Sequence, residues 1–172
     1  MLWLLAASLL PAPYFIRPAR ADDNKEYLVK AAFIYNFIKF VEWPDDKAIA
    51  KQSNIDICVL GDSPMIQTSA VFKQASTSRL GLSLVQTPSA QDAAGHCHVV
   101  FVSAGEEGQL AGLKGHPVLT VSDMDDFAEH GGMIGFTTQD NKIKLVINIK
   151  AAAAAGLRID AQLLEIALKV IK

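Results

Sequence analysis

Strand-like and helix-like segments alternate through the middle of this chain, and this order constrains the fold more than any other feature. The strand-like segments are short and rich in branched apolar residues, and they span 54–62, 81–86, 97–105 and 116–123. Helix-like segments lie between them at 63–76, where Ser63 is a suitable N-cap before Pro64, and at 106–115, which Gly115 closes. This alternation predicts parallel strands with helices on both faces of the sheet.

The C-terminal part of the chain has a different pattern. Segments 131–138 and 142–149 flank Gln139-Asp140-Asn141, which indicates an antiparallel hairpin. The run KAAAAAG then predicts a turn or two of helix with Gly156 as its C-cap, and Asp160 caps a last helix over 161–172. The predicted fold class is therefore α/β, with a mixed, mostly parallel sheet flanked by helices on both faces and a C-terminal antiparallel hairpin.

The first residues indicate export. Residues 2–10 are apolar but too few to span a bilayer, which takes roughly 20 residues. The small-residue site Ala19-Arg20-Ala21 follows, so the sequence predicts a secretory signal peptide over 1–21 and one α/β domain over 22–172. No basic residue precedes the apolar run, and the alternative is a lipid-anchoring or buried N-terminal helix. Loss of Arg17 and Arg20 with the leader changes the net charge from -2 to 14 minus 18, or -4.

The first helix of the predicted domain is unusually apolar. Asp23 and Glu26 form a capping box at its start, and Pro44 ends it at or before Trp43. Its apolar arc, in the stretch FIYNFIKFVEWP, covers about half the circumference, which is wider than the roughly 100° stripe of a surface helix. This apolar helix has three interpretations: a membrane span, a core helix or a surface that binds a partner. Lys30 and Lys39 argue against a span, and we expect the helix to be mainly core.

Two cysteines, Cys58 and Cys97, lie in strand-like segments. An exported chain permits them to form a disulfide, and the alternative is two small buried apolar side chains. Closing a loop of about 40 residues would stabilise the fold by about 4 kcal/mol in the chain-entropy model.

Candidate catalytic and metal-binding residues are few. His96 and His98 would share one face of a strand, but a zinc site needs a third or fourth ligand, and polar residues at a strand end are the simpler interpretation. The acids Asp123, Asp125 and Asp126 follow a strand, where doubly wound folds keep their sites, yet they equally suit the cap of a short helix.

The sequence lacks the motifs of two common enzyme classes and the charge of a nucleic-acid-binding protein. The chain has no G-x-S-x-G elbow and no G-x-G-x-x-G after a strand, and its net charge of -2 does not favour nucleic-acid binding. We therefore predict a protein that is not an enzyme and needs no cofactor.

The blocks KAAFIYNFIKFVEWP, ICVLGD, CHVVFVS, PVLTVSD, GGMI, VIN and AGL occur in this order after the predicted leader. In this respect the chain resembles the YfiR family of periplasmic regulators, from about Lys30 to Val170. The resemblance implies a periplasmic homodimer that binds the periplasmic sensor portion of an inner-membrane diguanylate cyclase and represses it, limiting cyclic di-GMP signalling and biofilm formation. It also matches the family's cysteine pair to Cys58 and Cys97. A second cysteine pair is missing around FAEHGGMIGF.

A protein that acts by contact needs apolar side chains outside its core. The candidates for partner binding are Trp43 at the exit of the first helix and Ile166 and Leu168 on the last one, with core packing as the alternative for each. A second hypothesis is a periplasmic small-ligand-binding module. Its site would lie at the C-terminal strand ends, near Gly61, Asp62, Ser103 and Asp123.

Overall fold

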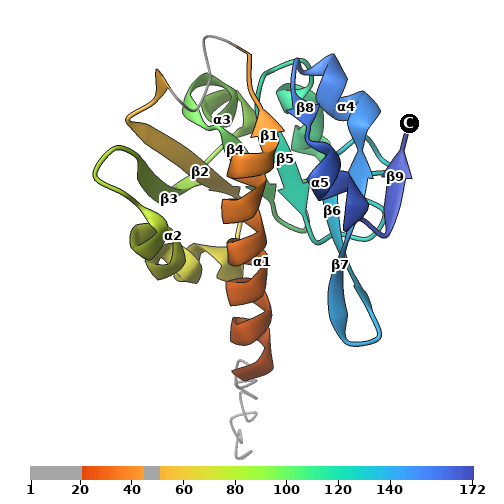
Figure 1. Cartoon of the computed structure of the whole chain (residues 1–172), viewed down its shortest axis with the longest axis horizontal. Coiled ribbons are helices and arrows are strands. Elements are labelled where there is room, and N and C mark those ends of the chain that lie inside the picture. The colour runs from red at the N-terminus through yellow and green to blue at the C-terminus, as the bar shows by residue number, and fades with distance from the viewer. Residues whose placement is uncertain (1–20, 45–50) are drawn as a thin grey trace, which may run out of the picture.

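A seven-stranded sheet forms the centre of the computed structural model, which describes residues 21–44 and 51–172, with the side chains from residue 24 (Figure 1). The strand order is β3-β2-β4-β5-β6-β7-β9. Strands β2 to β6 pair in parallel, β7 is antiparallel to β6, and β9 is parallel to β7. The strands are β2 (Asn54–Leu60), β3 (Gly81–Thr87), β4 (Val99–Val102), β5 (Leu119–Ser122), β6 (Ile134–Gln139), β7 (Lys142–Asn148) and β9 (Lys169–Ile171). The predicted mixed, mostly parallel sheet is confirmed.

Helices cover both faces of this sheet, as expected. One face carries α1 (Ala21–Phe40), the 3₁₀ helix η2 (Pro64–Thr68), α2 (Ser69–Ala75) and α5 (Ala161–Glu165). The other carries α3 (Ala90–His96) and the 3₁₀ helix η3 (Glu107–Leu113). Each face has its own cluster of buried side chains, because residues alternate along every strand between the two faces.

Helix α1 crosses the sheet and is mainly core. Ile34 and Phe37 are fully buried, and the Phe37 ring stacks on that of Phe136 in β6 with 5.9 Å between centroids. The helix ends at Phe40, because the chain then pairs as β1 (Val41–Glu42) with β8 (Arg158–Ile159) in a small antiparallel ladder that the sequence analysis did not predict.

The C-terminal hairpin and the alanine-rich helix follow the predicted pattern. Asp140 and Asn141 join β6 to β7 with φ of 50° and 56°, the left-handed backbone that a tight hairpin turn requires. Helix α4 (Ile149–Ala154) begins at Asn148, whose side chain accepts a hydrogen bond from the backbone N–H of Ala151 at 2.8 Å. Gly156 follows it with φ of 74°, as expected of a helix C-cap.

The region before β4 differs from the prediction. A strand was expected over 97–105, but α3 ends at His96, Cys97 is its C-cap and β4 begins only at Val99. Helix α3 was not predicted at all. Its N-cap Ser89 accepts from the backbone N–H of Asp92 at 3.1 Å, so the sequence carried a capping signal for it.

The last predicted helix is also wrong in its second half. Helix α5 ends at Glu165, and residues Lys169–Ile171 form β9, the edge strand beside β7. The free edge of β7 offers unpaired backbone groups, and Val170 and Ile171 are β-branched residues that suit a strand. Pairing with β7 therefore outweighs a helical pattern that the local sequence also fits.

The predicted leader, residues 1–21, lies almost wholly outside the described residues and stays a prediction. Within the described part of the chain, no helix combines the length and the apolar character that crossing a membrane would require.

Candidate functional site

A disulfide joins Cys58 in the middle of β2 to Cys97 in the turn between α3 and β4, with 6.0 Å between the Cα atoms. Both cysteines are fully buried in the cluster under α3. The two meet because β2 and β4 are parallel neighbours that place Cys58 opposite Val100, three residues after Cys97. The predicted pairing is confirmed.

The two histidines beside Cys97 do not share a face. His96 is exposed at the end of α3, and its Nε2 lies 3.9 Å from Cys58 Sγ. His98 is buried, and its Nδ1 accepts from the backbone N–H of Asp56 at 3.4 Å. The expected placement of His96 and His98 on one face of a strand is therefore wrong, because α3 ends at His96 and β4 begins only at Val99.

One metal-capable group does converge among the described residues. The ligand atoms of Cys58, His96 and Cys97 all lie within 4.8 Å of one another. The two sulfurs are bonded to each other, however, and a metal is bound by thiolates. In the oxidised protein this group is therefore a structural disulfide with the imidazole of His96 beside it.

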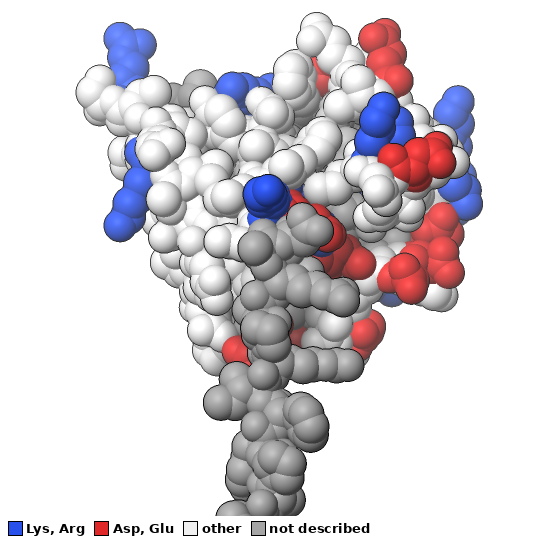
Figure 2. Space-filling model, turned by 90° about the horizontal axis from the view of Figure 1, so that it is seen from below, with Lys and Arg blue, Asp and Glu red and all other residues white. Residues whose placement is uncertain are grey.

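The C-terminal ends of the parallel strands hold an ion-pair network. The buried Lys30 ammonium, from α1, lies 2.6 Å from Glu26 Oε1 and 2.6 Å from Asp123 Oδ2, which follows β5. The same ammonium lies 4.4 Å from the centroid of the Tyr27 ring. Figure 2, which views this end of the molecule, shows acidic side chains gathered on the right-hand side of this face.

Burial raises the pKa of Tyr27 to about 12, and the neighbouring Asp123 charge and its hydrogen bond with the phenol act in the same direction. The tyrosine therefore stays neutral beside the carboxylate. The network joins groups of opposite charge to one another, which suits a support for the end of α1.

The residues predicted for a small-ligand site are not brought together. Gly61 and Asp62 line a shallow hollow of about 440 Å³ after β2 and β3. Asp123 lines a separate hollow of about 220 Å³ with Glu26 and Lys30. Ser103 is buried and lines neither hollow. The structure thus gives no single pocket built from these four residues.

The three predicted contact residues separate into two classes. Trp43 is buried, with 7% of its surface exposed, and packs in the cluster under α1. The core-packing alternative therefore holds for Trp43, which directly follows the β1–β8 ladder, and the burial contradicts its role as an exposed contact residue. Ile166 and Leu168 are exposed, at 57% and 49%, in the link between α5 and β9.

The backbone holds this exposed pair in place. The N–H of Ile166 bonds the carbonyl of Leu164, and the N–H of Leu168 bonds the carbonyl of Leu145 in β7 at 2.8 Å. Two apolar side chains are therefore presented on fixed backbone at the edge of the sheet.

Sequence reasoning missed a second exposed apolar pair, Leu28 and Val29 on the N-terminal half of α1. Val29 also lines an open groove with Phe33 and Ile143, between α1 and the β6–β7 hairpin. The sequence did indicate surplus apolar surface, since the apolar arc of this helix is wider than one face of a sheet can cover. It does not indicate which apolar side chains of the helix stay exposed.

Comparison with known proteins agrees with this fold. A solved structure from Vibrio cholerae O1 biovar El Tor strain N16961, described as a conserved domain protein, superposes with a TM-score of 0.56 at 12% identity, and the match covers 84% of this chain. The chain spans 60% of the length of that protein. An ABC domain in complex with L-Trp from Streptococcus pneumoniae matches with a TM-score of 0.48 at 15% identity, over 68% of this chain and 55% of that one. No curated protein matches.

The family comparison covers most of the sequence. The model of the family DUF4154, described as YfiR/HmsC-like, matches residues 27–168, which include the helix α1 motif, both cysteines and the strands that carry the quoted blocks. The chain therefore belongs to the YfiR/HmsC-like family.

Proposed function

We propose that this protein is a periplasmic repressor that binds the periplasmic sensor portion of an inner-membrane diguanylate cyclase and holds the enzyme inactive. The observation that carries the proposal is the family match over residues 27–168, since the family supports a periplasmic regulator of diguanylate cyclase signalling. The disulfide agrees with export to an oxidising compartment. Export itself rests on the predicted leader.

The surface that we propose for the cyclase is the exposed pair Ile166 and Leu168. Apolar side chains that stand on ordered backbone lose little conformational freedom on binding, and such residues act as anchors in protein interfaces. The pair projects beside β9, where the edge of the sheet also offers backbone groups.

Repression through such a surface is a population shift. The repressor has to bind the inactive cyclase more tightly than the active one, and about 5.5 kcal/mol of difference moves an equilibrium from 99:1 to 1:99. No reaction on the repressor is needed for this mechanism. A ligand or partner acts on an equilibrium only through its differential affinity.

The test uses residues 22–172, purified with the disulfide intact, and the sensor portion of a membrane cyclase encoded beside this gene. We expect direct binding by calorimetry and a lower cyclic di-GMP level in cells that express both proteins. The double variant Ile166→Ser/Leu168→Ser should weaken binding by at least about tenfold, as expected for central apolar anchors.

The control variant is Val85→Ser, which removes an exposed apolar side chain from β3 at the opposite edge of the sheet and should leave binding unchanged. Absence of binding to the sensor portion contradicts the proposed function. Binding that persists in the double variant keeps the function and rejects this surface.

We also infer from the family that the repressor is a homodimer. Light scattering on the purified domain measures the mass directly, and a monomer at micromolar concentration contradicts the inference.

A further inference from the structure

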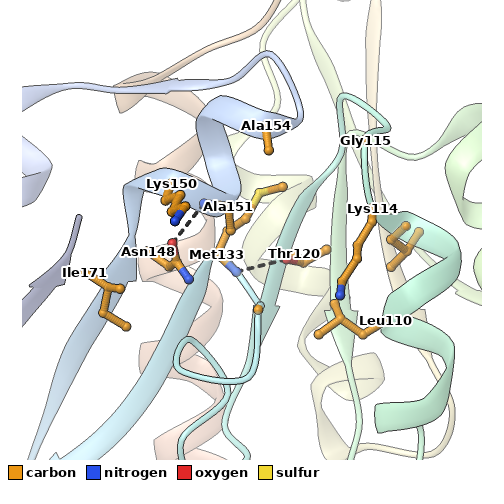
Figure 3. Close-up of a pocket in the computed structure, with 12 residues that line it drawn as sticks. Leu110, Lys114, Gly115, Thr120, Met133, Asn148, Lys150, Ala151, Ala154 and Ile171 are labelled. Carbon is orange, nitrogen blue, oxygen red and sulfur yellow. Dashed lines mark hydrogen bonds between the residues drawn. The ribbon is translucent and has the colours of Figure 1, made fainter.

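An apolar groove lies at the end of the sheet opposite to the Lys30 network, between η3 and α4 (Figure 3). Its volume is about 290 Å³. Thr120, Met133, Asn148 and Ile171 form its floor, where β5, β6, β7 and β9 start or end. Helix α3 and η3 cover the β2 and β4 part of this face, and Phe127 and Ala128, from the loop before β6, pack against Gly135 and Asn148 beside the groove.

The walls of the groove are mostly apolar. Leu110 and Leu113 come from η3, and Ala151 and Ala154 come from α4, whose small side chains keep the groove open. The polar groups on the floor already have partners within the protein. Thr120 Oγ1 accepts from the backbone N–H of Met133 at 3.0 Å, and the Asn148 amide donates to the carbonyl of Ala128 at 2.8 Å and caps α4.

Two lysines line the groove, one on each wall. Lys114 follows η3, and its side chain extends toward the floor, close to Gly131 (Figure 3). Lys150 lies in the first turn of α4. Among the described residues, the ion pairs involve Lys30, Arg158 and Lys169, and neither Lys114 nor Lys150. The groove thus combines an apolar lining with two cations for which the described part of the chain provides no ion-pair partner.

We propose that this groove binds an amphiphilic monocarboxylate, a medium-chain fatty acid, with the carboxylate between Lys114 and Lys150 and the chain along the leucine and alanine walls. The size limits the ligand. A cavity of about 150 Å³ holds benzene, so this groove holds about twelve non-hydrogen atoms, which is the size of decanoate. The charge favours an anion, because the described residues that line the groove include two lysines and no carboxylate. The proposal is independent of the proposed cyclase partner, because it concerns a different surface.

The test is calorimetric titration of the oxidised domain with sodium decanoate below its aggregation concentration. We expect one site per chain and an increase in melting temperature that grows with decanoate concentration. Decyltrimethylammonium carries an alkyl chain of similar length with a positive charge, and it should bind at least about tenfold more weakly, which corresponds to about 1.4 kcal/mol.

Two variants separate the charge from the cavity. Lys114→Met/Lys150→Met removes both cations and keeps the apolar stems, and it should weaken decanoate binding by at least about tenfold and reduce the preference over decyltrimethylammonium. Ala151→Leu narrows the groove with a good helix former and should weaken both amphiphiles. The control Lys73→Met removes an exposed lysine from α2 on the other face and should bind as the parent does.

Three results would overturn the proposal. They are the absence of saturable decanoate binding, equal binding of both amphiphiles, and binding that neither groove variant changes. Methyl chemical shifts of Leu110, Leu113 and Met133 give a second measurement, which locates the bound chain even where a variant loses stability.

Discussion

The two ends of the parallel strands differ in how their charged side chains are paired. At the C-terminal end, the Lys30 ammonium pairs with both Glu26 and Asp123, and the neutral phenol of Tyr27 completes the cluster. At the other end, Lys114 and Lys150 line an apolar groove whose described lining residues include no carboxylate, and Thr120 and Asn148 hydrogen-bond to backbone groups on its floor.

The comparison shows that position in the fold does not by itself identify a site. Doubly wound folds keep their ligands at the carboxyl ends of the strands, and this rule directed the ligand hypothesis to Gly61, Asp62, Ser103 and Asp123. In this chain the carboxyl end of β5 is braced by internal ion pairs, and a mostly apolar groove lies at the opposite end of the sheet.

The largest expected effect concerns the disulfide, which joins β2 to the turn before β4. Replacing both cysteines in Cys58→Ala/Cys97→Ala should lower the free energy of unfolding by about 4 kcal/mol, because the loop of 39 residues is no longer closed in the unfolded chain. The melting temperature should fall by roughly 10 °C, measured by circular dichroism.

Reductant serves as the control for this prediction. It should lower the melting temperature of the parent to near that of the double variant and leave the double variant unchanged. A parent whose melting temperature does not respond to full reduction, verified by thiol counting, contradicts the predicted role of the bridge.

A smaller loss is expected from Lys30→Met at the C-terminal end. The substitution keeps the buried apolar stem but leaves Asp123 without its cation, and we expect a loss of about 2–3 kcal/mol, below the range of fully buried pairs because Glu26 is exposed and Asp123 partly so. Denaturant unfolding measures it. Lys39→Met, which removes an exposed lysine from the same helix, should cost less than about 1 kcal/mol.

The further double variant Lys30→Met/Asp123→Asn sharpens this test. If the unpaired carboxylate causes the loss, neutralising it should restore part of the stability. A double variant that is less stable than Lys30→Met alone would mean that Asp123 has another structural role.

At the groove end, Asn148→Ala should cost about 2 kcal/mol, since it removes the N-cap of α4 and leaves the Ala128 carbonyl without its donor. The control is Asn141→Gly in the hairpin turn, where glycine suits the left-handed backbone and the change should stay within about 0.5 kcal/mol. Equal stability of both variants would mean that the groove floor does not depend on this asparagine.

The fold was predictable to the extent that its signals are local. The alternation of strands and helices, the Asp140-Asn141 turn and the Gly156 cap each follow from short stretches, and the structure contains all of them. Helix α3 was missed although Ser89 and Asp92 gave a capping signal. Strand β9 was missed because a helical pattern also fits its residues, and only the free edge of β7 decides between the two.

The candidate sites show the same limit. The cysteine pair was predicted, whereas the burial of Trp43 depends on the β1–β8 ladder between segments far apart in the sequence. The groove is assembled from η3, the start of β6, α4 and the end of β9, so no single stretch carries its signature. Sites built from one motif are visible in a sequence, and sites built from the packing of several elements are not.

The smallest expected effect tests the neutral phenol at the C-terminal end. The pKa of Tyr27 is about 12 in the folded chain and about 10 when unfolded, so the unfolded state loses this proton first as the pH rises. The stabilisation of the folded chain that comes from keeping this phenol neutral is fully present below pH 10 and is lost as the pH rises through 12. The Tyr27→Phe variant has no phenol proton to lose. The free energy of unfolding of the parent should therefore fall relative to that of the variant between pH 9 and pH 11.5. Urea unfolding at both pH values measures it, with Tyr35→Phe as the control. A difference that is constant over this range would mean that the phenol has the same pKa in the folded and the unfolded chain, which contradicts the predicted effect of burial and Asp123.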